Sequence, residues 1–141
     1  MEIPSNKKTV LFICKHNSAR SQMAEGFLKH LYNEFYDVYS AGTNPGKINP
    51  YAIKVMANRG IDISMNRSKG LNEFKNKEFY YVITVCDEEG DACPFFPGGR
   101  NYIHKSFPDP TIINDNDETK IKYFTQIRNQ IEEWINKTFN R

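Results

Sequence analysis

The sequence has little net charge and no long apolar run. Hydrophobic residues make up 39% and charged residues 26% of the 141 residues, with a formal net charge of +2. No stretch is long and apolar enough to span a bilayer, so we expect no membrane partner. The near balance of acidic and basic residues predicts no nucleic-acid partner either. This composition is typical of an ordinary globular domain.

Cysteine is also scarce, and we expect no secretory leader. There are three cysteines, and the stretch from Met1 to Lys8 is polar with no apolar segment. An odd number of cysteines without an export signal argues against a framework of structural disulfides. We therefore expect a cytoplasmic protein whose thiols are reactive or incidental.

Internal repeats, low-complexity segments and interdomain linkers are absent as well. A chain of this length can bury a core of its own, so we expect one domain over residues 8–141, a flexible tail over residues 1–7, and a monomer.

Strand-like and helix-like segments alternate along the chain, which predicts an α/β domain with a parallel sheet. We also expect a short helix that contains Leu71 and Phe74, with Ser68 as its N-terminal cap. Ligands of such sheets bind at the carboxyl ends of the strands, where Cys14, Cys86 and Asp109 fall. The expected strands cover residues 9–14, 37–41, 80–85 and 102–104, and the expected longer helices cover 18–33, 50–60 and 118–138.

The stretch around Cys14 carries the strongest functional signal. The apolar run Val10 to Ile13 leads into Cys14, and five residues separate Cys14 from Arg20, where a helical pattern begins. A loop that enters a helix N-terminus directs several backbone N–H groups at one point and binds oxyanions. Arg20 adds a planar fork of donors, and the same field favours the nucleophilic thiolate of Cys14. The pattern predicts a loop that binds an oxyanion and attacks it.

This loop contains no glycine, although a tight anion-binding loop usually needs a residue with positive φ. Asn17 is the best candidate for that conformation, since asparagine tolerates the left-handed region. Ser18 and Ser21 supply hydroxyl groups that can stabilise a thiolate. The alternative is a buried cysteine at a strand end, followed by an unrelated arginine.

The segment CKHNSARSQMAEGF resembles the signature of the thioredoxin-coupled arsenate reductases, which share the fold of the low-molecular-weight protein tyrosine phosphatases. The resemblance extends from about Lys8 to the C-terminal helix. It implies a three-layer sandwich with a four-stranded parallel sheet, of the Rossmann or flavodoxin-like kind. The phosphatases tend to carry proline where this chain has Gln22. By resemblance, arsenate, or phosphate or sulfate as analogues, binds Lys15, His16, Asn17, Ser18, Ala19, Arg20 and Ser21.

Cys86 and Cys93 enclose an acidic segment that contains a glycine. Either cysteine alone would most simply be a half-buried packing residue. A flexible loop of this length can, however, bring its ends within disulfide range. The pattern V-C-D…C-P is similar to the two resolving cysteines of the arsenate reductases, which the phosphatases do not need.

Asp109 lies in the segment Phe107-Pro108-Asp109-Pro110. Asp-Pro commonly begins a turn, which is the simple structural interpretation. The functional interpretation is a general acid that protonates the leaving oxygen, and the Asp-Pro pair matches the acid loop of the family. The phosphatases usually place an aromatic residue next, where this chain has Thr111.

We expect no cofactor and no bound metal. His16 has no second ligand at metal spacing, and Lys15 and His16 are expected at the rim of the loop. Some relatives bind potassium at positions that match Asn17, Glu25 and Ser40. Where they have a further carboxylate this chain has Lys69, so the ammonium group is expected beside Glu25 in place of the cation.

The resemblance implies that the protein reduces arsenate to arsenite. Cys14 would be the nucleophile, Cys86 and Cys93 would resolve the intermediate, and thioredoxin would reduce the final disulfide. The first alternative is a low-molecular-weight phosphatase that hydrolyses phosphomonoesters through a phosphocysteine. The second is a module that binds oxyanions or senses thiols without catalysis.

Overall fold

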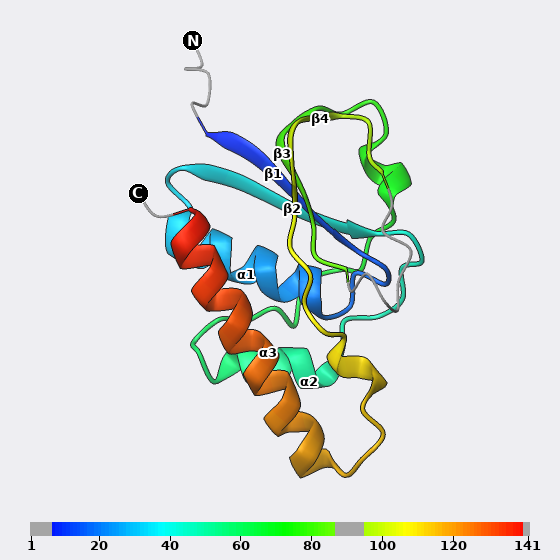
Figure 1. Ribbon diagram of the computed structural model, residues 1–141, viewed down its shortest axis with the longest axis vertical. Helices are drawn as coiled ribbons and strands as arrows, with labels where there is room; N and C mark the ends of the chain where they lie inside the picture. The colour runs from blue at the N-terminus through cyan, green and yellow to red at the C-terminus, as the bar shows by residue number, and fades with distance from the viewer. Residues whose placement is uncertain (1–6, 87–94, 140–141) are drawn as a thin grey trace.

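The computed structural model describes residues 7–86 and 95–139 (Figure 1). Most of the expected N-terminal tail, and Cys93, lie outside these residues. The strands and longer helices expected from the sequence are confirmed with small shifts at their ends. In chain order the elements are β1 (Lys8–Cys14), α1 (Arg20–Tyr32), β2 (Tyr36–Gly42), α2 (Pro50–Ala57), η1 (Leu71–Phe74), β3 (Phe79–Thr84), β4 (Gly99–His104), η2 (Pro110–Ile112) and α3 (Asp117–Thr138).

The four strands form a parallel sheet in the order β2-β1-β3-β4. Strand β1 is central, and its residues Val10 to Ile13 are completely buried. A strand that is covered on both faces must be apolar at successive positions, which explains the run in the sequence. Cys14 pairs with Gly42 on β2, so the end of β1 lies beside the end of β2.

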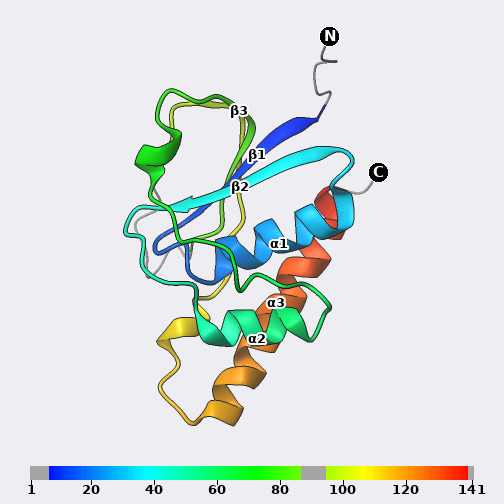
Figure 2. The same ribbon diagram turned by 180° about the vertical axis from the view of Figure 1, so that it is seen from behind.

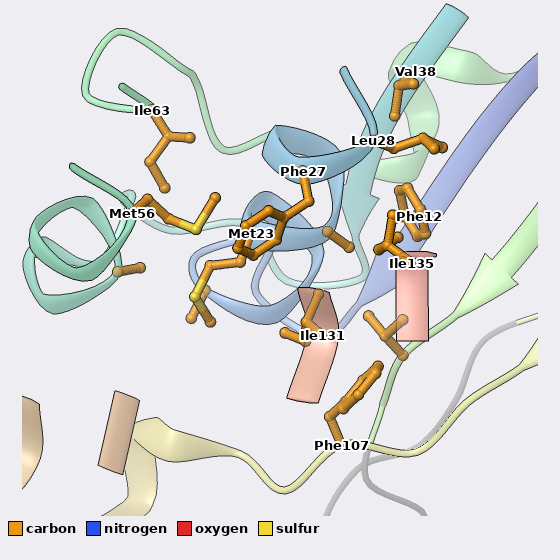
Figure 3. Packing of buried hydrophobic residues seen from close by; sticks show 14 of the residues in the cluster. Phe12, Met23, Phe27, Leu28, Val38, Met56, Ile63, Phe107, Ile131 and Ile135 are labelled. Carbon is orange, nitrogen blue, oxygen red and sulfur yellow. The ribbon is translucent and has the colours of Figure 1, made fainter. Parts of the chain in front are cut away.

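Helices α1 and α3 cover one face of the sheet, and α2 packs beside them (Figures 1 and 2). Figure 3 shows Met23 and Phe27 of α1 in the centre of this core, with Met56 of α2 on one side and Phe12 of β1 on the other. A smaller cluster forms on the opposite face, where Phe74 of η1 packs with strand residues such as Leu11. The α/β fold with a parallel sheet that the sequence predicted is thus confirmed, with packing on both faces of the sheet as the resemblance implied.

The helix ends follow from local sequence. Asn49 accepts a hydrogen bond from Tyr51 N at the start of α2, and Asn116 accepts one from Thr119 N at the start of α3. Gly60 has φ of 76° and supplies the left-handed stop expected after α2. No helix among the described residues is long and apolar enough to cross a membrane.

The expected cap at Ser68 is wrong. Helix η1 begins after Gly70 with no side-chain cap. The Ser68 hydroxyl instead donates to the carbonyl oxygen of His16 at 2.7 Å and accepts from Gly46 N at 3.0 Å. Ser68 therefore holds the loop after β1, a contact between residues 52 positions apart.

Candidate active site

The loop between β1 and α1 places the thiol of Cys14 at the carboxyl end of the sheet. Cys14 is only 2% exposed, and its Sγ lies 2.9 Å from Ser21 Oγ. Ser21 Oγ also accepts a hydrogen bond from Asn17 Nδ2 at 2.8 Å. Of the two serines expected to act on the thiol, Ser21 contacts it, and Ser18 is bound through its backbone carbonyl to Asn49 N at 2.9 Å.

The tight loop is made possible by two residues, one of which the sequence did not reveal. Asn17 has φ of 51°, so the expected left-handed residue is confirmed. The second residue is Gly42 on β2. A Cβ atom at Gly42 would lie 2.5 Å from the carbonyl oxygen of Lys15 and 2.8 Å from Asn17 N. The glycine that this loop requires thus stands on the neighbouring strand.

Neighbouring segments bind the outward-facing carbonyl groups of the loop. Asn44 N donates to Lys15 O at 2.7 Å, and Ser68 Oγ donates to His16 O. Because the peptide is planar and trans, each N–H points away from the preceding carbonyl. The N–H groups of His16 and Asn17 therefore face away from these partners. Such successive N–H groups at a helix N-terminus form an anion-binding nest.

Arg20 begins α1 and connects the Cys14 loop to the segment after β4. Its side chain is 3% exposed; Nη1 donates to Phe107 O at 3.3 Å, and Nη2 lies 3.5 Å from Asp109 Oδ2. Arg20 and Asp109 are thus in contact, and as expected Cys14 ends β1 and Asp109 follows β4.

The contacts of Asp109 confirm the turn that Asp-Pro predicts, and its second carboxylate oxygen lies beside Arg20. Its Oδ1 accepts hydrogen bonds from Thr111 N at 2.9 Å and from Thr111 Oγ1 at 2.6 Å, which is an Asx turn at the start of η2. Its Oδ2 faces Arg20. Thr111, which the sequence marked only as the place of a missing aromatic residue, is thus a direct partner of Asp109.

Cys86 follows β3 and is completely buried. Its Sγ lies 3.9 Å from the carbonyl oxygen of Ile13, and Val85 N donates to the same oxygen at 2.9 Å. Because Ile13 directly precedes Cys14, two of the three cysteines lie at the ends of adjacent strands, as expected. The role proposed for Cys93 falls outside the described residues.

The expected contact of Glu25 with Lys69 is confirmed. Glu25 is 4% exposed and accepts a hydrogen bond from Ser40 Oγ. Lys29 Nζ lies 2.6 Å and Lys69 Nζ 3.9 Å from its carboxylate. Burial lowers the pKa of Lys69, and the charge of Glu25 partly offsets that effect. Within residues 7–86 and 95–139, no three His, Cys, Asp or Glu side chains gather as metal ligands.

Comparison of the sequence with known proteins identifies the family of this chain. The sequence profile of the low molecular weight phosphotyrosine protein phosphatases matches residues 9–141. An arsenate reductase of Halalkalibacterium halodurans is 40% identical over 134 residues, 95% of this chain and 96% of that protein. An arsenate reductase of Bacillus subtilis is 36% identical over 124 residues, 88% of this chain and 89% of that protein.

Solved structures of arsenate reductases also resemble this structure. An arsenate reductase in the phosphate-binding state superposes with a TM-score of 0.75 at 32% identity, over 92% of this chain and 95% of that one. A thioredoxin-dependent arsenate reductase of Corynebacterium glutamicum gives 0.67 at 31% identity, over 99% of this chain and 66% of that one. The chain therefore belongs to the low-molecular-weight phosphotyrosine protein phosphatase family, in which it is related to the arsenate reductases.

Proposed function

We propose that this enzyme reduces arsenate to arsenite through a relay of three cysteines. The observation that carries the proposal is the second thiol, Cys86, buried at the strand end beside Cys14. A phosphatase of this fold needs only the nucleophile, the arginine and the acid. A redox reaction needs another thiol within reach of the first.

The first step is nucleophilic attack. Arsenate binds the Cys14 loop, where backbone N–H groups and the Arg20 guanidinium hold its oxygens. The Cys14 thiolate attacks arsenic, forms an S–As bond and displaces a hydroxyl group of arsenate. That hydroxyl takes a proton from Asp109 and leaves as water. In the free protein Arg20 pairs with Asp109, so an oxyanion that engages Arg20 competes for the same donors.

The next two steps move electrons and the disulfide. The Cys86 thiolate attacks Cys14 Sγ, so an S–S bond forms while the S–As bond breaks. Arsenic keeps the electron pair of that bond and leaves as arsenite, As(III). Cys93 then attacks Cys86, which regenerates the Cys14 thiolate and leaves a disulfide between Cys86 and Cys93. The two electrons that reduced arsenic thus come from two thiols.

An external dithiol must reduce that disulfide, and we assign this role to thioredoxin, in a cytoplasmic reaction. Support comes from the cysteine pattern and from the likeness to the thioredoxin-dependent protein of C. glutamicum. The rival function is hydrolysis of phosphomonoesters through a phosphocysteine at Cys14. The family profile is named for phosphatases and is compatible with that rival. The Cys14 loop does not separate the two substrates, because arsenate and phosphate have nearly the same shape and charge.

A single turnover separates the two functions. The fully reduced protein is mixed with arsenate in the absence of any reductant, arsenite is quantified, and the cysteine pairing is mapped by mass spectrometry. We expect one arsenite per chain and a disulfide between Cys86 and Cys93. Free thiols throughout, together with rapid cleavage of para-nitrophenyl phosphate, would identify a phosphatase instead.

A Cys93→Ser variant isolates the last thiol. It should complete one turnover, accumulate a disulfide between Cys14 and Cys86, and stop, whereas the parent cycles with thioredoxin and its reductase. Sustained thioredoxin-driven cycling in this variant would disprove the relay.

A further inference from the structure

Gln22 lies in the first turn of α1, is completely buried and has no part in the reaction steps above. Its Nε2 faces three oxygens: Asn17 Oδ1 at 2.9 Å, Asn17 O at 3.2 Å and Arg67 O at 3.1 Å. Its Oε1 accepts a hydrogen bond from Asn66 Nδ2 at 3.1 Å. A buried amide with partners at both ends has a fixed orientation.

Backbone groups determine which end of each amide is the donor. The carbonyl oxygen of Arg67 can only accept, so the NH2 end of Gln22 must face it. The backbone N–H of Lys69 can only donate, and it lies 2.8 Å from Asn17 Oδ1. The oxygen of the Asn17 amide therefore faces Lys69 N and Gln22 Nε2, and the orientation does not rest on the amide atoms alone.

The orientation of the Asn17 amide determines, through Ser21, the direction of the hydrogen bond between Ser21 and Cys14. Asn17 Nδ2 must point at Ser21 Oγ and donate to it. A hydroxyl group has one hydrogen, which then remains for Cys14 Sγ at 2.9 Å. The sulfur is thus the acceptor, and a donor aimed at sulfur favours the thiolate.

The opposite orientation of Asn17 would reverse this effect. Its NH2 group would face the N–H of Lys69 and the NH2 of Gln22, which places donors against donors. Its oxygen would face Ser21, whose hydrogen would turn to that oxygen and away from sulfur. Cys14 would then be the donor to Ser21, and the neutral thiol would be favoured.

We propose that Gln22 is a positioning residue that fixes the Asn17 amide and thereby makes Cys14 a hydrogen-bond acceptor. The inference deepens the proposed function, because it concerns the reactivity of the same nucleophile. Gln22 stands where phosphatases of the fold tend to carry proline, whose side chain has no hydrogen-bond donor. Its two contacts with Asn17 also hold that residue in its left-handed conformation.

The test is the pH dependence of Cys14 alkylation by iodoacetamide in the full-length reduced protein, quantified at Cys14 by mass spectrometry. Gln22→Leu keeps the approximate shape and removes the donors. We expect alkylation about tenfold slower at pH 6, with an unchanged limiting rate at high pH. Ser21→Ala should shift the profile in the same direction. The double variant should shift no further than Ser21→Ala, because both act through one bond.

Two variants keep the test decisive if Gln22→Leu fails to fold. Asn66→Ala removes only the outer partner of Gln22 and should slow alkylation at pH 6 by about two- to threefold. Gln22→Glu places an oxygen against Asn17 Oδ1 and should slow alkylation at pH 6 by at least about tenfold relative to the parent. Profiles that coincide with the parent in both, or additive shifts in the double variant, would overturn the proposal.

A matched control separates this role from general destabilisation. Arg128 is also buried and polar. Its Nη1 donates a hydrogen bond to Val55 O at a distance of 3.0 Å, and neither residue belongs to the Cys14 loop. Arg128→Met should lower the midpoint of thermal unfolding and leave the alkylation profile in place. The assay uses no arsenate, so a parent protein that fails to reduce arsenate would refute the proposed function and leave this inference standing.

Discussion

The loop that carries Cys14 and the loop that carries Asp109 meet at Arg20, but the fold holds them in different ways. The Cys14 loop is bound from several segments, including Gly42, Asn44 and Ser68. The Asp109 carboxylate is bound by its near neighbour Thr111 and by Arg20. The proposed nucleophile is therefore positioned by several distant segments of the fold, whereas the proposed acid is positioned by a local turn and by Arg20, the residue proposed to bind the substrate oxygens.

Arg20→Lys should produce the largest effect, since it disturbs both loops at once. Lysine keeps the charge but cannot reach Phe107 O and Asp109 together or grip two oxygens of an oxyanion. We expect kcat/KM for arsenate reduction to fall by about 100- to 1000-fold. Steady-state kinetics with thioredoxin measure this loss. A fall below tenfold would show that the backbone N–H groups bind the oxyanion without the bidentate fork.

Asp109→Asn should have the second-largest effect on activity. Asparagine can keep the turn with Thr111 but cannot supply a proton to the leaving oxygen, so single-turnover kcat should fall by about 100-fold. Thr111→Val is the matched control. It removes one hydroxyl donor from Asp109 and should cost less than about tenfold. Equal losses in the two variants would indicate that the turn, and not proton transfer, is what Asp109 provides.

Lys69→Ala tests the side of the Cys14 loop that is remote from Asp109. The change leaves the buried Glu25 with Lys29 as its remaining cation among the contacts described above. The free energy of unfolding should drop by about 1–2 kcal/mol, measured by urea denaturation. Lys29→Ala, at a half-exposed side chain, should cost only about 0.5 kcal/mol. Unchanged stability and activity in Lys69→Ala would rule out a role for its ammonium group.

Glu132→Gln should have the smallest effect and should touch neither loop. Arg59 donates to Glu132 and lowers the pKa of that carboxyl, chiefly through the hydrogen bond. A carboxyl whose pKa is depressed on folding stabilises the protein above its unfolded pKa of about 4.3, and this contribution disappears as the pH falls through the folded pKa.

The expected loss in Glu132→Gln is below about 1 kcal/mol at pH 7, and it should shrink near pH 3 in urea titrations at both pH values. Turnover should stay at the parent rate. Glu133→Gln, at an exposed carboxylate paired with Lys137, is the control and should show no measurable change. A pH-independent difference for Glu132→Gln would mean that the ion pair is not its source.

Local chemistry made much of the fold and half of the site predictable. The apolar run from Val10 to Ile13 identified the central strand, because a strand buried on both faces cannot alternate. The left-handed conformation of Asn17 was predictable because few residues other than glycine tolerate it. Cys14, Cys86 and Asp109 followed from the rule that ligands bind at strand ends. Arg20 followed from its place at the start of a helix, separated from Cys14 by five residues.

The remaining features depend on contacts between distant residues. Ser68 looked like a helix cap, but its hydroxyl binds His16 O. Gln22 looked like a substitution for proline, and its partners Asn66 and Arg67 lie more than forty positions along the chain. A polar residue in the buried first turn of a helix was a signal that it had partners, although sequence alone could not say which.

Gly42 has a consequence for protein engineering. The catalytic motif reads as a continuous cassette from Cys14 to Ser21, yet a side chain on β2 would collide with the backbone of Lys15 and Asn17. Transplanting the cassette into another strand–helix junction would therefore fail unless the host also offered a bare backbone on the adjacent strand. The unit that can be transplanted therefore consists of the segment from Cys14 to Ser21 together with a glycine at the position of Gly42 on the adjacent strand.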